Sequence, residues 1–320
     1  MKITCYGSRG SLPAPSRPEF STVQYGGNTN CFYIEAGPFK IIEGCGSGVA
    51  VLGDVLMKEW KETGRGRTFI VLLNHFHWDH IQGLPFCVPF FLRSNTFHIH
   101  GFAPSGHEGD QPRTAVEMML AHQQSNPHFP VAHESMPAQK VYRSHNRQFS
   151  ETVCYQTLYH TGTSGISMCQ PPVAMDLSDA IRMRLLLLTT IPLQHPDGCL
   201  GYRVEYMGKV VAFCYDCEPL RFPNKAISSL AKGADLLVLD GAYTDEQLRG
   251  AQQGFGHGSP ESCVEQAKDA GAKRCLIHHH DPKHDDVTLQ EMENRAGAHA
   301  IVSGYAGEVA FAREGAVYTL

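Results

Sequence analysis

The sequence of 320 residues predicts an α/β fold in which strands and helices follow one another. Short apolar runs of strand length recur along the chain, and segments with apolar residues at three- and four-residue spacing stand between them. The hydrophobic fraction of 42% and the charged fraction of 18% are ordinary globular values, which argues against disorder. At this length the chain can form one large domain or two, and it can bury a sizeable core.

The first part of the chain contains five expected strands and two expected helices. The strands are expected at residues 1–6, 31–35, 39–43, 68–73 and 96–100. The first helix is expected to open at Gly46 and end near Lys61, because one of its faces carries an apolar stripe. That stripe consists of Val51, Leu52, Val55, Leu56 and Trp60. The second helix is expected over 112–124, with Pro112 near its first position.

The later part of the chain continues the alternation. Strands are expected at 209–214, 235–239 and 274–277, and helices at 224–232 and 287–296. Ser259 is a typical N-cap and Pro260 suits the first helical position, which predicts another helix to about residue 270.

Three histidines and an aspartate follow the apolar strand 68–73 within six positions. The segment reads His75-Phe76-His77-Trp78-Asp79-His80. Side chains alternate along a strand, so His75 and His77 point to the same side, while Asp79 and His80 lie in the turn beyond. Imidazole and carboxylate ligands without a thiolate suit Zn²⁺, Fe or Mn²⁺. The segment predicts a metal centre at the end of this strand.

The His-x-His-x-Asp-His pattern resembles the metallo-β-lactamase superfamily, and three later segments extend the resemblance. They are Gln194-His195-Pro196 before Gly201-Tyr202, Cys214-Tyr215-Asp216, and His278-His279-His280-Asp281-Pro282. The resemblance implies a four-layer αββα sandwich with the metal site at one edge of the two sheets. It also implies two divalent ions, Zn or Mn with Fe possible. The implied ligands are His75, His77 and His195 for one ion, Asp79, His80 and His279 for the other, and Asp216 as a bridge.

The choice of His279 rests on its match to the family's His-His-Asp-Pro motif, and His278 stays open as an alternative. Glu43 stands where relatives often carry aspartate. A carboxylate normally orients a ligating imidazole through its other nitrogen, a role that Glu43 or Asp281 could serve.

The N-terminal segments 7–15 and 25–31 are similar to the phosphodiesterase-like branch, which includes relatives of ribonuclease Z. The resemblance covers nearly the whole chain and implies a single domain over residues 1–320. A family-atypical insertion is expected around residues 145–193. By the same resemblance, His257 before Ser259 contacts the substrate phosphate and helps to protonate the leaving group. Asp79 is expected to be required for turnover. His128, in a loop similar to one near the pocket of this branch, is expected to contact substrate.

The resemblance implies a metal-dependent hydrolase. The leading hypothesis is a phosphodiesterase that cleaves a small phosphodiester, such as a 3′,5′-cyclic nucleotide, through a hydroxide bound by two metal ions. A tRNA 3′-end endonuclease is an alternative. The formal charge of −5 and the short stretch between His195 and Asp216, with no room for a tRNA-clamping insertion, argue against it. An acyl-bond hydrolase of lactonase or thioesterase type and a non-catalytic nucleotide-binding protein are further alternatives.

We expect a cytoplasmic protein, because the chain opens without a signal peptide. Apolar runs such as 185–188 are far below the ~20 residues that span a membrane. Without export, the eleven cysteines give little reason to expect disulfides. Cys214 and Cys217 are expected to be small buried residues beside the metal site. Most of the histidines outside the motifs are expected to be solvated or singly hydrogen-bonded, and a homodimer is possible by resemblance.

Overall fold

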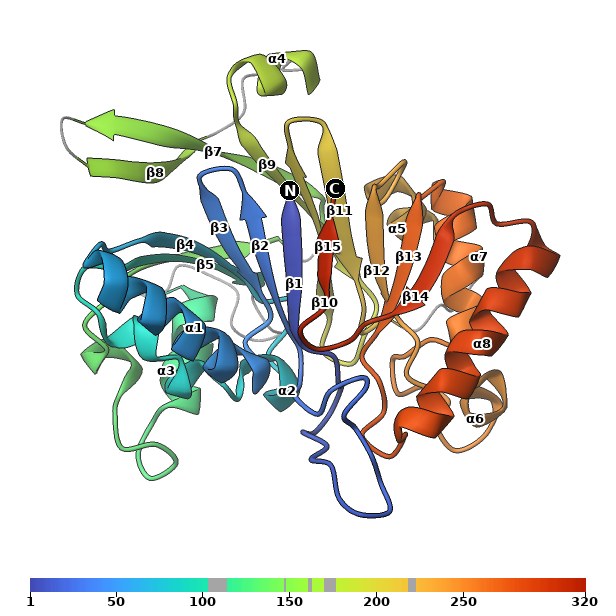
Figure 1. Cartoon of the computed structure of the whole chain (residues 1–320). Helices are drawn as coiled ribbons and strands as arrows, with labels where there is room; N and C mark the ends of the chain where they lie inside the picture. Colours follow the sequence, from blue (N-terminus) through green and yellow to red (C-terminus); the bar gives the residue numbers. More distant parts are fainter. Residues whose placement is uncertain (103–113, 147, 161–162, 170–176, 218–222) are drawn as a thin grey trace.

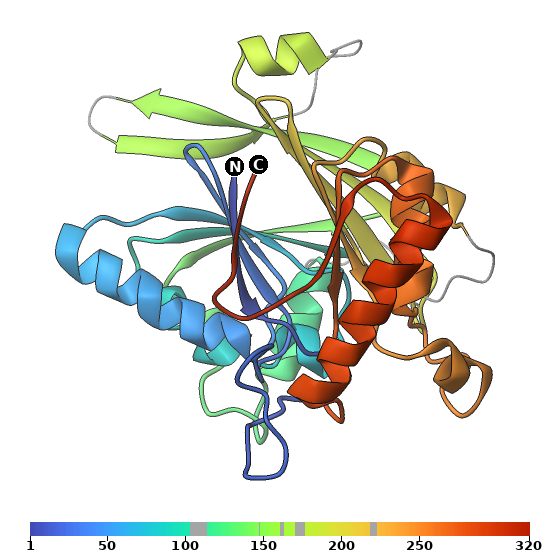
Figure 2. The same cartoon turned by 45° about the vertical axis from the view of Figure 1, so that its right-hand side comes forward.

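Two mixed β-sheets pack face to face, and helices cover the outer face of each sheet in the computed structural model (Figure 1). The structure describes residues 1–102, 114–146, 148–160, 163–169, 177–217 and 223–320. Helices α1 (Gly48–Thr63) and α3 (Ala115–Gln123) lie outside the first sheet. Helices α7 (Pro260–Ala270) and α8 (Asp286–Ser303) lie outside the second (Figure 2). The arrangement is the four-layer αββα sandwich that the resemblance implied.

The first sheet has seven strands in the order β15-β1-β2-β3-β4-β5-β6. Their bounds are β1 Lys2–Gly7, β2 Cys31–Ala36, β3 Phe39–Glu43, β4 Thr68–Leu72, β5 Thr96–Phe102, β6 Gln139–His145 and β15 Val317–Thr319. The strands from β3 to β6 run parallel, so their carboxyl ends meet at one edge.

The second sheet has eight strands in the order β14-β13-β12-β11-β10-β9-β7-β8. Their bounds are β7 Glu151–His160, β8 Thr163–Cys169, β9 Leu186–Leu193, β10 Cys199–Tyr206, β11 Lys209–Cys214, β12 Leu236–Asp240, β13 Arg274–His278 and β14 Glu308–Phe311. The strands from β11 to β14 run parallel. Their carboxyl ends, together with the turn between β9 and β10, form the second edge from which functional side chains project.

Shorter helices complete the fold. They are α2 (Trp78–Ile81), α4 (Leu177–Arg182), α5 (Lys225–Leu230) and α6 (Asp245–Arg249), with 3₁₀ turns η1 (Leu84–Phe86), η2 (Val88–Phe91) and η3 (His133–Ser135). None of the helices in the described ranges is long and apolar enough to cross a membrane.

The core is divided by the layers. One buried cluster lies between the sheets and joins Phe32 of β2 with Tyr202 of β10 and Phe213 of β11. A second cluster packs α1 against the first sheet, and a third packs α5, α7 and α8 against the second sheet. Because both faces of the central strands are covered, these strands read as nearly continuous apolar runs.

Helix α1 forms where expected, but its buried face differs from the predicted stripe. Val49, Leu52 and Leu56 are buried against the sheet, whereas Val51 and Val55 are exposed. The sequence contains two overlapping apolar stripes, and packing against β2 and η2 selects the one that also carries Gly53. Helix α3 is capped by Thr114, whose side chain accepts a hydrogen bond from the Glu117 amide; Pro112 lies outside the described residues.

Segment 145–193, for which an insertion was expected, contains helix α4 and the strands β7, β8 and β9, which join the second sheet. The β7–β8 hairpin extends beyond the rest of that sheet (Figure 1). A disulfide joins Cys154 and Cys169, whose Cα atoms lie 5.1 Å apart across the hairpin. The expectation of unpaired cysteines is therefore wrong for this pair, which adjacent-strand pairing brings together.

Candidate metal centre

The loop after β4 presents the histidine motif at the carboxyl edge of the first sheet. Two hydrogen bonds fix its start: Tyr202 Oη donates to the Leu73 carbonyl (2.8 Å), and the His75 amide donates to Asn74 Oδ1 (3.0 Å). His77 is extended, and helix α2 then turns Asp79 and His80 inward. The chain direction therefore changes between His75 and His77 on one side and Asp79 and His80 on the other, as the sequence predicted.

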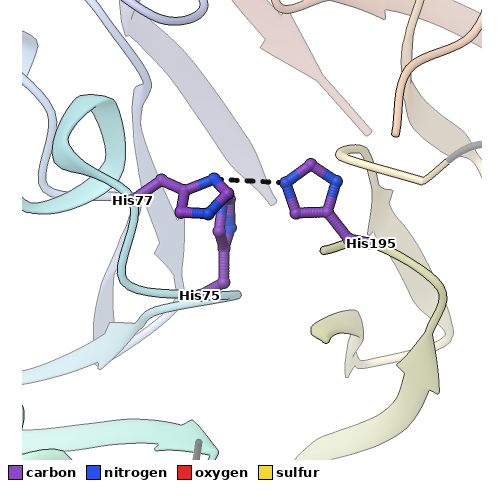
Figure 3. A group of neighbouring side chains, drawn as sticks. All are labelled: His75, His77 and His195. Carbon is purple, nitrogen blue, oxygen red and sulfur yellow. Dashed lines mark hydrogen bonds between the residues drawn. The ribbon is translucent and has the colours of Figure 1, made fainter. Parts of the chain in front are cut away.

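Three histidines from two elements converge at the opening of the site (Figure 3). The rings of His75 and His77 are centred 4.3 Å apart, and His77 Nδ1 lies 3.2 Å from Nε2 of His195. His195 reaches them from the turn between β9 and β10, and its Nδ1 is 3.2 Å from the Gly256 carbonyl. The ligand nitrogens of these three residues lie within 4.8 Å of one another.

A second group lies deeper and combines carboxylates with imidazoles. His279 Nε2 lies 3.0 Å from Asp79 Oδ2 and 3.0 Å from Asp216 Oδ1. His80 Nε2 lies 3.1 Å from each of the same two carboxylates. Asp216 therefore stands between His80 and His279, and it also groups with His75 and His80. The seven side chains singled out in the sequence occupy one continuous site.

The backbone at two of these residues is in the left-handed region, with φ of 55° at Asp216 and 62° at His279. Such conformations cost energy for residues other than glycine and are concentrated at functional sites. The turn at His279 separates it from its neighbours: His278 Nε2 donates to the Gly7 carbonyl (3.0 Å) and His280 Nε2 to the Ala312 carbonyl (2.9 Å). His279 alone of the triplet faces the carboxylates.

The chemistry of this donor set fits divalent metal ions. Within the described residues, both ring nitrogens of His75 are buried without a hydrogen-bond partner. Burial, together with the neighbouring His80, lowers the pKa of His75 well below 6.5, so the ring is neutral and offers a lone pair. Burial alone would raise the pKa of Asp216, but the surrounding histidines hold it well below 3.8. Buried carboxylates beside neutral imidazoles are stabilised by a cation.

Asp240 adds a carboxylate that the motif analysis missed. It ends β12, and its Oδ2 lies 2.5 Å from Nδ1 of His257. Burial alone would lower the pKa of His257, but the Asp240 carboxylate raises it above 6.5. Asp240 and His257 group with Asp216 and His279. One signal in the sequence could have revealed Asp240. It directly follows the apolar residues of β12, a strand that runs parallel to the strand ending at the histidine triplet.

The comparisons with known proteins agree with this geometry. Residues 171–280 match the family model described as a beta-lactamase superfamily domain. The ribonuclease Z of Haloferax volcanii is 24% identical over 297 residues, which cover 87% of this chain and 84% of that protein. The short form of human tRNase Z has a TM-score of 0.59 at 16% identity and covers 100% of this chain and 99% of its own. These matches support the resemblance to the metallo-β-lactamase superfamily.

A diphosphatase of the PhnP family is a further structural neighbour of this metallo-β-lactamase fold protein. Its TM-score is 0.59 at 14% identity, and the match covers 100% of this chain and 97% of that chain. At this identity, both solved structures establish the likeness of fold. The superfamily fold implies divalent metal binding, in agreement with the clusters of histidine and aspartate.

Behind the metal centre, a buried chain of side chains leads from His80 to Glu43. Asn30 Nδ2 lies 3.0 Å from His80 Nδ1 and 2.8 Å from Tyr215 Oη, which donates to the Glu43 carboxylate. Burial raises the pKa of Glu43 to about 8. Glu43 therefore acts on the imidazole through Tyr215 and Asn30, not by the direct contact that the sequence suggested.

Asp281 does not take the orienting role proposed for it either. Its carbonyl accepts a hydrogen bond from Arg9 (3.0 Å), and its carboxylate accepts one from the Lys283 amide. Arg9 is fully buried and also donates to the carbonyls of Gly26 and His284, so it braces the loops around His279.

The remaining site expectations have mixed outcomes. His128 is exposed, and its loop packs through Phe129 against Phe86, with ring centroids 5.5 Å apart. Cys214 and Cys217 are buried as expected. Most of the other histidines were expected to be solvated or singly hydrogen-bonded; His100 is an exception, because it is buried between His145 (2.8 Å) and Tyr155 (2.5 Å). A histidine pattern in sequence does not reveal such partners from distant strands.

Proposed function

We propose that this protein is a metal-dependent phosphodiesterase acting on a small phosphodiester, with 3′,5′-cyclic nucleotides as the leading substrate class. The observation that carries the proposal is the His257–Asp240 pair beside the metal centre. Cleavage of an alkyl phosphodiester requires a proton for the leaving alkoxide, and a histidine held by a carboxylate can supply it. Hydrolase chemistry of the superfamily supports the reaction class.

We assign the metal ligands as two groups that share Asp216. His75, His77 and His195 would hold one divalent ion, and Asp79, His80 and His279 would hold the other. Bound Zn²⁺ or Mn²⁺ would lower the pKa of a water ligand and polarise the phosphoryl oxygens. The protein orients these ligands: Gly256 restrains the ring of His195, and Asn30 restrains the ring of His80. Asp79 is required in this scheme because it lies between His80 and His279.

His257 is assigned as the proton donor and phosphate contact. Nδ1–H of the imidazolium donates a hydrogen bond to the Asp240 carboxylate, which leaves the Nε2 proton available for the leaving oxygen. The loop leads directly into α7, an 11-residue helix with a Ser259 capping box and Pro260 at its start. The positive end of that helix favours a nearby phosphate. His128 is a weaker candidate for substrate contact, through the loop beside Phe86.

Two observations favour a small substrate over RNA. The formal charge is −5, and the segment between His195 and Asp216 is taken up by β10, the short Met207-Gly208 turn and β11. This connection leaves no room for a clamping insertion. The tRNA 3′-end endonuclease remains the second candidate because the full-length relative from Haloferax volcanii carries the name ribonuclease Z. Acyl-bond hydrolysis is the third candidate, since an activated water can also attack a carbonyl.

The test is a substrate panel with purified protein reconstituted with Zn²⁺ or Mn²⁺. It contains 3′,5′- and 2′,3′-cyclic nucleotides, a precursor tRNA with a 3′ trailer, a dinucleotide with a diphosphate bridge, and a lactone and a thioester. Chelator-sensitive turnover of a cyclic nucleotide that Asp79→Ala abolishes would support the proposal. Faster cleavage of the precursor tRNA, the diphosphate or an acyl substrate would replace it. Size-exclusion chromatography with light scattering on the same sample tests the expected homodimer.

A further inference from the structure

Two large aromatic side chains stand exposed at the opening of the metal centre. The exposed fraction is 63% for Trp78 and 53% for Phe255. Within the described part of the chain, neither ring packs against another aromatic ring. Phe86, which is equally exposed, meets Phe129 edge-on. Large apolar surfaces left in water beside a polar site are typical of ligand-binding surfaces.

The two rings belong to the start of helix α2 and to the loop before α7, and the chain next to each ring meets the ring of His195. Trp78 directly follows His77, whose Nδ1 lies 3.2 Å from His195 Nε2. Phe255 directly precedes Gly256, whose carbonyl lies 3.2 Å from the other ring nitrogen, Nδ1. His195 therefore lies between the segment that carries Trp78 and the segment that carries Phe255. His77 is itself exposed, which places the opening of the site on this side.

A substrate phosphate in the metal centre would extend its organic portion toward these rings. Aromatic side chains recognise nucleobases by stacking, and each stacked base is worth about tenfold or more in affinity. An alkyl phosphodiester without a base gains no comparable contact. With divalent ions bound, the opening would combine a cationic centre for the phosphate with flat apolar surfaces for a ring.

We propose that Trp78 and Phe255 form the base-binding walls of the site, so that the preferred phosphodiesters are those of nucleosides. This inference rests on the proposed function and deepens it by naming the part of the substrate that the protein recognises outside the phosphate. Trp78 and Phe255 are specificity residues in this scheme, because they contact the base and not the reacting atoms.

The chain offers a direct binding test because it has only two tryptophans, Trp60 and Trp78. In a Trp60→Phe background, fluorescence reports Trp78 alone. We expect saturable quenching of the Zn²⁺-reconstituted protein by 5′-AMP but not by ribose 5-phosphate, and at least tenfold weaker AMP binding when Phe255→Ala is added. The matched control is Met207→Ala, at the turn between β10 and β11 on the opposite edge of the sheet, which should leave AMP binding unaltered. Equal responses to the two ligands, or no response to AMP, would overturn the proposal.

A kinetic test compares 3′,5′-cyclic AMP with ribose 3′,5′-cyclic phosphate, which lacks the base. Trp78→Ala should lower kcat/KM for the nucleotide at least tenfold more than for the ribose compound, mainly through KM, and Trp78→Phe should restore most of the loss. Equal losses on both substrates, or a change of oligomeric state in Trp78→Ala, would overturn base stacking. If wild type hydrolyses neither compound, the phosphodiesterase proposal fails, while the fluorescence measurement still decides the role of Trp78.

Discussion

Asp240 Oδ2 and His257 Nδ1 lie 2.5 Å apart, although 17 positions of sequence separate the two residues. The contact joins the carboxyl end of β12 to the loop before α7. Because a carboxylate only accepts hydrogen bonds, it fixes the proton on Nδ1 and sets the orientation of the imidazole. Both side chains are buried at the edge of the metal centre, where their charge is poorly screened.

His257→Ala should therefore slow hydrolysis by about 10²- to 10⁴-fold for substrates with poor leaving groups. For a nitrophenyl phosphodiester, whose leaving group needs no proton, the loss should be much smaller. Steady-state kinetics on a series of leaving groups measures the difference. Asp240→Asn should produce a weaker version of the same pattern. Losses that do not depend on the leaving group would assign His257 to phosphate positioning alone.

Asp216→Asn should remove most of the bound metal, because this carboxylate lies between both groups of proposed ligands. An amide keeps the shape but loses the negative charge that offsets the cations. Metal content per chain, measured by elemental analysis after gel filtration, is the readout. His128→Asn, at an exposed loop position, is the control and should keep wild-type metal content. Full occupancy in Asp216→Asn would contradict the assignment of the bridge.

Gly10→Ala should weaken metal binding although it leaves every proposed metal ligand in place. A Cβ at this position would overlap the His279 ring, so the imidazole must move away from Asp79 and Asp216. Gly297→Ala is the matched control, since a Cβ there, in the middle of α8, meets nothing. That control should be neutral or stabilising by about 0.5–1 kcal/mol. Competition titration with a chromogenic chelator measures the affinity, and equal affinities in the two variants would refute the close packing.

Tyr215→Phe should reduce metal affinity by about 10- to 100-fold, since it cuts the buried chain from Glu43 to Asn30 that restrains His80. Tyr305→Phe removes a buried hydroxyl that binds the Ala272 carbonyl, and it serves as the control. The same chelator competition applies to both variants. A Tyr215→Phe protein with wild-type affinity would show that His80 is oriented without this chain.

His133 should make the protein sensitive to acid at a place away from the metal centre. It is buried beside Gln124 and Tyr142, and burial, aided by Lys140, lowers its pKa to about 4. Since the unfolded pKa is near 6.5, the stability from this group is present above pH 6.5 and is lost as the pH falls toward 4. Between pH 7.5 and 4.5 the loss should be about 2.5 kcal/mol.

Urea unfolding of metal-free wild type and His133→Gln at both pH values tests this. The difference between their pH dependences isolates His133, because every other titrating group is common to both proteins. We expect the variant to lose about 2.5 kcal/mol less than wild type on acidification. Parallel losses would mean that His133 is not held neutral by burial.

The sequence by itself determined the fold class and the ligand types. Local spacing was sufficient to predict the side-chain directions in the His75–His80 segment. Alternation along a strand places His75 and His77 on one side, and the turn that follows directs Asp79 and His80 elsewhere. It was also sufficient for α7, whose Ser259 cap and Pro260 are local signals. His195, Asp216 and His279 were predicted as metal ligands from the motif resemblance. Local periodicity could not have placed them in the same site as the His75–His80 segment.

Only the tertiary structure decided which partners these residues meet. Asp240 was missed because its partner, His257, reaches it through chain reversal over β12 and α6. The sequence showed that Glu43 replaces the aspartate common in relatives. Its connection to His80 through Tyr215 and Asn30, however, depends on the packing of three strands. The buried face of α1 depended on which of two apolar stripes met the sheet. Local sequence fixes dihedral preferences and periodicity, whereas side-chain contacts between distant segments arise from packing.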